Sequence, residues 1–230
     1  MARTKNKFIG VFSHDGDILN GRNQSIRDTW APLASVYANM KFFIGGGTLE
    51  LQKDEIRLPN REGKDFIYQA LDMFQISLTD GYEHFLIVDT DTYVNVFEMF
   101  QTDFIDYDYT GTLVGKLGEL YGDTNLYSFM QGHAVWYSRK ALEFVVNELV
   151  ETANRLMPIA TGVDIQATLH APDVWTGQVL APKYLNSLIT IKDDSRYSHG
   201  PLTYHAPEAR KRDVPTWMRE LHRQIIQETK

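Results

Sequence analysis

The chain has 230 residues, which suits one large domain or two small ones, and its 43% hydrophobic and 12% aromatic residues are typical of a globular protein with a sizeable core. Its formal net charge of −7 disfavours a protein whose main task is to coat nucleic acid. The absence of cysteine excludes disulfides and thiolate metal sites and favours a reducing compartment.

The amino-terminal segment and the hydropathy of the chain both predict a soluble protein. The basic residues 1–7 are followed by a short apolar run at 8–12, which is shorter than the core of a signal peptide. No window approaches the ~20 apolar residues that a membrane-spanning helix needs. We therefore expect a cytoplasmic protein without a membrane span.

Apolar residues in the first hundred positions alternate between strand spacing and helix spacing. The spacing predicts strands over residues 8–13, 41–44 and 85–88, helices over 21–40 and 64–79, and a short helix over 94–100. Pro32 falls inside the first helix and is expected to split or kink it.

The second half of the chain continues this alternation. It predicts strands over 107–114, 131–137 and 187–192, a loop over 115–127, helices over 138–155 and 215–227, and a mobile flap at 196–212. Ser138 is expected to cap the first of these helices. The alternation indicates an α/β domain with a mostly parallel central sheet flanked by helices.

Two carboxylates follow the most apolar of the predicted strands. Asp89 and Asp91 come directly after residues 85–88 (FLIV). Open α/β sheets bind ligands at the carboxyl ends of their strands, and two oxygen ligands one residue apart suit Mg²⁺ or Mn²⁺. The pattern therefore predicts a metal site that can hold a diphosphate, although turns are also rich in aspartate.

Three other segments carry residues suited to chemistry. Arg22 and Arg27 lie at a predicted helix start and could meet a phosphate or a nucleobase edge. Alternatively, Arg27 could pair with Asp28 or with a glutamate on a neighbouring element. Asp173 suggests a tight turn that fixes a carboxylate as a general base, with an ordinary helix cap as the alternative. His199 or His205 could complete the metal shell, or could be surface histidines.

Four motifs in series resemble those of glycosyltransferase family 31, which contains inverting β-1,3-galactosyl-, N-acetylglucosaminyl- and Fringe-type enzymes. Residues 22–30 (RNQSIRDTW) resemble the family's Arg-Arg-x-Ala-Ile-Arg-x-Thr-Trp, and residues 89–95 (DTDTYVN) its Asp-Asp-Asp-x-(Phe/Tyr)-Val-Asn. Residues 131–139 (QGHAVWYSR) resemble Ser-Gly-x-Gly-Tyr-Val-x-Ser-Arg, and residues 173–177 (DVWTG) resemble Glu-Asp-Val-x-x-Gly.

The chain departs from the family pattern at three places. Thr90 replaces the middle aspartate, Pro172 replaces the acidic residue before the expected base, and residues 131–133 lack the second glycine. The family's eukaryotic members are membrane-anchored and contain cysteine, which this chain lacks. The resemblance therefore points to a bacterial or viral cytosolic relative with a different acceptor.

The resemblance implies a GT-A fold in one domain over residues 1–230, with a nucleotide-binding half at 1–100 and an acceptor half at 101–230. It implies that Asp173 is the general base, that Asp91, Asp89 and His205 hold Mn²⁺ or Mg²⁺, and that His199 is the reserve ligand. Donor-binding residues would be Ser13, Arg22, Arg27, Asp89 and Thr90, and acceptor-pocket residues Gly132, His133 and Trp175.

The implied reaction is the inverting transfer of a sugar from a nucleotide-diphosphosugar, such as a UDP-sugar, to an acceptor hydroxyl. The acceptor would be a glycan or a hydroxymethylated DNA base, which the basic terminal residues could help contact. Two alternatives remain open: a phosphatase or phosphotransferase of the haloacid-dehalogenase type, and a non-catalytic module that binds nucleotide-sugars.

Overall fold

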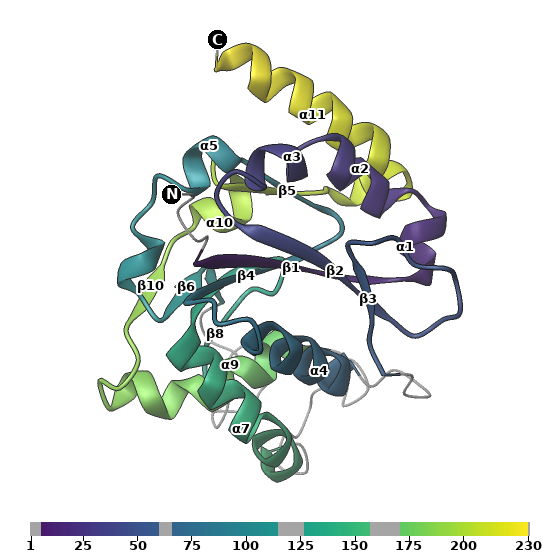
Figure 1. The fold of residues 1–230 in the computed structure, drawn as a ribbon. Helices are drawn as coiled ribbons and strands as arrows, with labels where there is room; N and C mark the ends of the chain where they lie inside the picture. The colour runs from purple at the N-terminus through teal and green to yellow at the C-terminus, as the bar shows by residue number, and fades with distance from the viewer. Residues whose placement is uncertain (1–5, 60–65, 115–126, 157–170, 230) are drawn as a thin grey trace.

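The apolar run at residues 85–88 lies in a central strand of the sheet. The computed structural model describes residues 6–59, 66–114, 127–156 and 171–229. In it, β4 (His84–Asp89) pairs in parallel with β1 (Lys7–His14) and antiparallel with β9 (Ala134–Ser138). Figure 1 shows β1 and β4 in the middle of the molecule.

Within the described residues the main sheet has seven strands in the order β10-β6-β9-β4-β1-β2-β3. Neighbouring strands are parallel except around β9, which is antiparallel to both of its neighbours. The remaining strands are β2 (Asn39–Gly45), β3 (Glu55–Arg57), β6 (Tyr109–Gly111) and β10 (Ile191–Asp193). The expected α/β fold with a mostly parallel sheet is thereby confirmed.

Helices cover both faces of this sheet (Figure 1). One face carries α2 (Arg22–Asp28), α3 (Ala31–Ala34) and α11 (Val214–Glu228), and the other carries α4 (Phe66–Leu78), α7 (Arg139–Leu156) and α9 (Pro172–Leu185). Side chains of β4 alternate between the two cores, with Leu86 on one side and Phe85 on the other. None of the described helices is long and apolar enough to cross a membrane.

Most predicted elements of the first half are confirmed. Pro32 lies in the first turn of α3 and the expected long helix is divided into α2 and α3, since proline is tolerated at a helix start but not inside one. The expected helix over 94–100 is shorter, because β5 (Thr92–Val94) precedes α5 (Val96–Met99). Three elements of the first hundred residues were not predicted: α1 (Asp15–Leu19), β3 and β5.

Element boundaries in the second half differ more from the prediction. The strand expected over 107–114 is divided into β6 and β7 (Leu113–Val114), and the strand expected over 131–137 begins at Ala134. Residues 187–190 are not a strand, because the backbone N–H groups of Leu188 and Ile189 bond the carbonyl of Lys183 at the end of α9. The loop expected over 115–127 lies almost wholly outside the described residues.

The segment expected to be a mobile flap forms regular structure. It contains α10 (Arg196–His199), β11 (Thr203–His205) and the 3₁₀ helix η2 (Glu208–Asp213). Strand β11 pairs antiparallel with β5, which ties the flap to the residues that follow Asp91.

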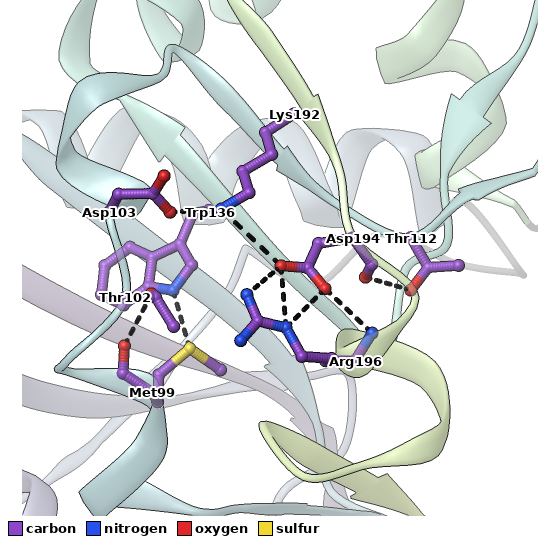
Figure 2. A network of polar contacts seen from close by, with 8 residues as sticks. All are labelled: Met99, Thr102, Asp103, Thr112, Trp136, Lys192, Asp194 and Arg196. Atoms are coloured by element: carbon purple, nitrogen blue, oxygen red, sulfur yellow. Dashed lines mark hydrogen bonds and ion pairs between the residues drawn. The ribbon is translucent and has the colours of Figure 1, made fainter.

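A polar network holds the entry to this segment (Figure 2). The carboxylate of Asp194 accepts bonds from the guanidinium of Arg196, at 2.9 Å from Nε, and its backbone carbonyl accepts a bond from Thr112 Oγ1 at 3.0 Å. Nearby, Trp136 Nε1 lies 3.1 Å from Met99 Sδ. These contacts fasten the turn after β10 to the chain after β6 and so fix where α10 and β11 begin.

Gly177 allows α9 to pack closely on the strand β8 (Phe129–Met130). A Cβ added at Gly177 would lie 2.8 Å from the Cα of Phe129, which is backbone and has little freedom to move. The absence of a side chain at Gly177 therefore sets the position of the whole helix.

We expect Gly177→Ala to lower the free energy of unfolding by about 1–3 kcal/mol, because the added methyl group overpacks the contact between α9 and β8. Urea unfolding measured by circular dichroism tests this. An unchanged free energy of unfolding would show that α9 can move away from β8 without cost.

Candidate functional site

The carboxyl ends of β1 and β4 open into two adjoining cavities in the described part of the chain. The larger has a volume of about 440 Å³ and the smaller about 240 Å³. Phe12, Phe66 and Asp89 line both cavities. The arrangement places Asp89 between two compartments that a single ligand could span.

Asp89 is the last residue of β4 and is surrounded by other carboxylates. Burial, followed by the neighbouring charges of Asp91, Asp173 and Asp17, raises the pKa of Asp89 well above its ordinary value. Its backbone N–H donates to the carbonyl of His133 at 3.3 Å, which extends the pairing of β4 with β9 to the edge of the site. In the protein alone, Asp89 is therefore a weaker acid than an ordinary aspartate, because burial and the neighbouring carboxylates disfavour its ionised form.

Strand pairing between β5 and β11 brings His205 to Asp91. In this register His205 lies opposite Thr92, and the N–H of Ala206 donates to the carbonyl of Asp91 at 2.9 Å. The Nδ1 atom of His205 lies 3.3 Å from Oδ1 of Asp91. The structure thus places His205 in contact with Asp91, as the proposed metal site requires. The side chain of His199 lies outside what the structure describes.

His133 supports this histidine from the other side. Its ring centroid lies 5.0 Å from that of His205, and its buried Nε2 bonds the carbonyl of Tyr197 at 2.9 Å. A carbonyl only accepts hydrogen bonds, so Nε2 carries the proton. The ring of His133 is therefore held in one orientation against His205.

The donor atoms at this edge match a hard divalent cation in type. Among the described residues, no group of three or more histidine, aspartate or glutamate side chains is close enough to form a metal site unaided. Asp91 and His205 supply a carboxylate oxygen and an imidazole nitrogen in contact, and Asp89 adds a second carboxylate nearby. Mg²⁺ and Mn²⁺ sites of this kind take their other ligands from water and substrate phosphates.

Asp173 lies in the first turn of α9, not in the tight turn expected from the sequence. Pro172 occupies a first-turn position of that helix, where proline is favoured. The two carboxylate oxygens accept bonds from the N–H groups of Gly132 at 2.9 Å and Val174 at 3.0 Å. Burial raises the pKa of Asp173, and these backbone donors oppose the rise.

Asp173 faces the larger cavity together with two of the predicted acceptor-pocket residues, Gly132 and His133. A carboxylate fixed by two backbone N–H groups at a cavity wall has the placement that a general base needs.

The smaller cavity is lined by four of the five predicted donor-binding residues, namely Ser13, Arg22, Asp89 and Thr90. Arg22 Nη1 lies 3.2 Å from Oδ1 of the buried Asp17, and Arg22 Nη2 donates to the carbonyl of Lys211 at 3.2 Å. Asp17 was not singled out from the sequence, because it lies in a helix that was not predicted.

Arg27 does not line either cavity. Its guanidinium donates to Asp54 at 2.8 Å and Glu55 at 2.7 Å and lies 4.4 Å from the ring centroid of Phe42. The side chain of Glu55 is fully buried, so this pair joins α2 to β3 inside the fold. The alternative interpretation of Arg27, a structural ion pair with a glutamate on a neighbouring element, fits its position, since Glu55 lies in β3.

Trp175 is a core residue and does not line the larger cavity. It is fully buried among the apolar side chains of α7, α9 and the sheet. Residues two apart on a helix point roughly 200° apart, so Asp173 and Trp175 face opposite ways. The expectation that Trp175 forms part of an acceptor pocket is therefore not supported by its position.

Several basic residues near the carboxyl terminus are paired with acidic side chains. Arg219 lies 2.8 Å from Asp28, and Lys211 lies 2.7 Å from Glu208. These ion pairs neutralise part of the positive charge that was expected to contact nucleic acid.

The sequence matches no protein-family model and no curated protein, so the resemblance to glycosyltransferase family 31 stays a prediction. The structure is similar to that of a glycosyltransferase involved in the glycosylation of the major capsid of PBCV-1. The TM-score is 0.52 at 14% identity, covering 92% of this chain and 98% of that one. At this identity the likeness shows the fold alone.

Two structures of the glycosyltransferase GlyE from Streptococcus pneumoniae TIGR4 were also found, both at 11% identity. Their TM-scores are 0.49 for the apo form and 0.44 for the other structure. In each case the match covers 97% of this chain and 64% of the GlyE chain.

We expect Arg27→Ala to lower the free energy of unfolding by about 3–5 kcal/mol, because it leaves the buried carboxylate of Glu55 without its cation. The matched control Arg223→Ala removes an exposed arginine and should change stability by less than about 0.5 kcal/mol. Urea unfolding of both variants measures the difference. A stable Arg27→Ala variant with weakened nucleotide binding would instead support the donor-binding role.

Proposed function

We propose that this protein is a metal-dependent glycosyltransferase that moves a sugar from a nucleotide-diphosphosugar to an acceptor hydroxyl with inversion at the anomeric carbon. One observation supports the proposal most strongly. Carboxylates suited to a cation and a fixed carboxylate suited to a general base line the same two adjoining cavities. Asp89 ends the central strand β4 and Asp91 follows it, and Asp173 lies in the wall of the larger cavity. The fold shared with a glycosyltransferase adds support.

The donor diphosphate is assigned to the smaller cavity. Asp91 and His205, with Asp89 beside them, would hold Mn²⁺ or Mg²⁺, which when bound neutralises charge on the departing nucleoside diphosphate. Arg22 lines the same cavity and adds positive charge at its wall. Ser13 and Thr90 offer hydroxyl groups at the ends of β1 and β4.

Asp173 is assigned the role of general base. Its carboxylate lies in the larger cavity, while the diphosphate is assigned to the smaller one, so the acceptor oxygen would approach the sugar from the side opposite the leaving group. The carboxylate takes the acceptor's proton as the new bond to the anomeric carbon forms. Its raised pKa makes it a stronger base than an exposed aspartate, and the N–H groups of Gly132 and Val174 hold it in place.

The acceptor is proposed to be a hydroxyl group of a glycan. A hydroxymethylated DNA base is the second candidate, and the paired state of Arg219 and Lys211 leaves less positive charge to hold a DNA backbone. The donor nucleotide is proposed to be uridine-based.

We expect Asp173→Asn to fold and to bind donor while sugar transfer falls by ~10²–10⁴-fold, the usual effect of removing a general base. The matched control is Asp80→Asn, which changes an exposed aspartate. Product formation and donor affinity are measured separately over a panel of UDP-, GDP- and TDP-sugars. Wild-type turnover in Asp173→Asn would exclude this residue as the base.

The base is active when it is deprotonated, so the rate should fall as pH falls through the pKa of Asp173. Because burial raises that pKa, the acid limb should lie above the ordinary aspartate value of 3.8.

We expect Asp91→Asn to weaken Mn²⁺ binding in the presence of UDP by at least roughly 10–100-fold. Loss of a residue that only hydrogen-bonds a metal ligand already has an effect of this size, and Asp91 is proposed to be a ligand itself. Electron paramagnetic resonance of free Mn²⁺ measures this binding, with the exposed Asp106→Asn as control. Unchanged affinity for Mn²⁺ would place the cation at other residues.

A further inference from the structure

Gln69 is a buried polar side chain that the proposed reaction leaves without a role. It lies on α4, is 8% exposed, and lines the smaller cavity. No protein group among the described residues bonds its amide, and the amide atoms are open to the cavity. An amide whose donor and acceptor face a cavity without a protein partner can bond a ligand that enters it.

Two other polar side chains of this cavity already have partners within the protein. Ser13 Oγ donates to Asn23 at 2.8 Å, and the carboxylate of Asp17 pairs with Arg22 at 3.2 Å. Gln69 thus differs from these neighbours in offering both a free N–H donor and a free carbonyl acceptor.

Gly45 at the end of β2 allows the amide to occupy its position. A Cβ added at Gly45 would lie 2.8 Å from Cδ of Gln69 and closer still to its Oε1. The backbone of Gly45 has no positive φ, so alanine is compatible with its conformation. The missing side chain therefore serves the packing of the amide over the end of β2.

The distance between Gln69 and the acidic cluster determines which part of a ligand the amide of Gln69 can contact. Strands β2 and β4 lie on either side of β1, so with strands ~4.8 Å apart their ends are about 10 Å apart. The proposed diphosphate lies at the end of β4 and the amide at the end of β2. In a nucleoside diphosphate the base lies one ribose away from the diphosphate.

The surroundings of Gln69 fit a flat heteroaromatic group better than a phosphate or a sugar. Phe12 and Phe66 line the same cavity with ring centroids 6.3 Å apart, and they offer apolar faces and edges. The carboxylates of Asp17 and Asp91 on the other walls repel further anions. The sugar is assigned to the larger cavity beside Asp173, on the other side of Asp89.

We propose that Gln69 hydrogen-bonds the edge of the donor's nucleobase and determines which nucleotide the protein binds. This inference rests on the proposed function. A carboxamide can pair in two places with a base edge that carries an adjacent acceptor and donor, such as the imide of uracil or thymine. Gly45 acts as a positioning residue, since it leaves room for the amide.

Two variants test the proposal by different routes. Gln69→Met keeps the length of the side chain without its hydrogen bonds or any new charge, and Gly45→Ala displaces the amide while leaving it intact. Gln75→Met, at an exposed position of the same helix, is the matched control. Calorimetric titration with Mn²⁺ present measures the binding of UDP, dTDP, GDP, ADP, CDP and inorganic pyrophosphate.

We expect the wild-type protein and Gln75→Met to bind one nucleoside diphosphate far more tightly than pyrophosphate. In Gln69→Met and Gly45→Ala, affinity for that nucleotide should fall by about 10–100-fold, the loss that removal of a paired base contact brings. Affinity for pyrophosphate should stay unchanged, which a general loss of structure would not allow.

Wild-type affinity and nucleotide preference in both variants would overturn the role of Gln69. This outcome is separate from failure of the proposed function, because binding is measured without turnover. A protein that discriminates bases through Gln69 but transfers no sugar from any donor would keep this inference and refute the transferase.

Discussion

The crowding of carboxylates at the end of β4 is the constraint on which the rest of the site depends. Asp91, Asp173 and Asp17 all act on Asp89 and, with burial, raise its pKa well above the ordinary value. The protein compensates in part, since Arg22 pairs with Asp17 and Lys211 acts on Asp89 in the opposite direction. Repulsion of this kind favours entry of a cation, and the cation in turn attracts a diphosphate. The acidic cluster therefore explains both parts of the proposed donor site.

The fold produces this cluster from segments that are distant in the chain. Parallel pairing places the ends of β1, β2 and β4 along one edge, and the antiparallel strand β9 brings Gly132 and His133 to the same edge. The pairing of β11 with β5 adds His205, and the close contact of Gly177 with β8 sets the start of α9, where Asp173 lies. Each side chain is thus held by regular structure, which keeps like charges close in spite of their repulsion.

The sequence predicted the parts of the site that depend on local pattern. Asp89 and Asp91 were found because they follow an apolar strand, and Asp173 because proline, an apolar pair and glycine surround it. The kind of turn at Asp173 was wrong, although Pro172 is also a helix-start signal. Arg27 could not be resolved from pattern alone, since its partners Asp54 and Glu55 are joined to it by tertiary packing. Gln69 belongs to no motif. Its proposed role follows from its burial beside Gly45, and this contact between α4 and β2 cannot be predicted from a single sequence.

We propose above all that the carboxyl edge of β4 binds a cation together with the diphosphate of a nucleotide. A crystal structure of the protein with Mn²⁺ and UDP, with the anomalous signal of manganese, tests it most directly. We expect a manganese peak beside Asp91 and His205, the diphosphate in the smaller cavity, and uracil against Gln69. Manganese bound away from Asp91, or a diphosphate bound outside the smaller cavity, would contradict it.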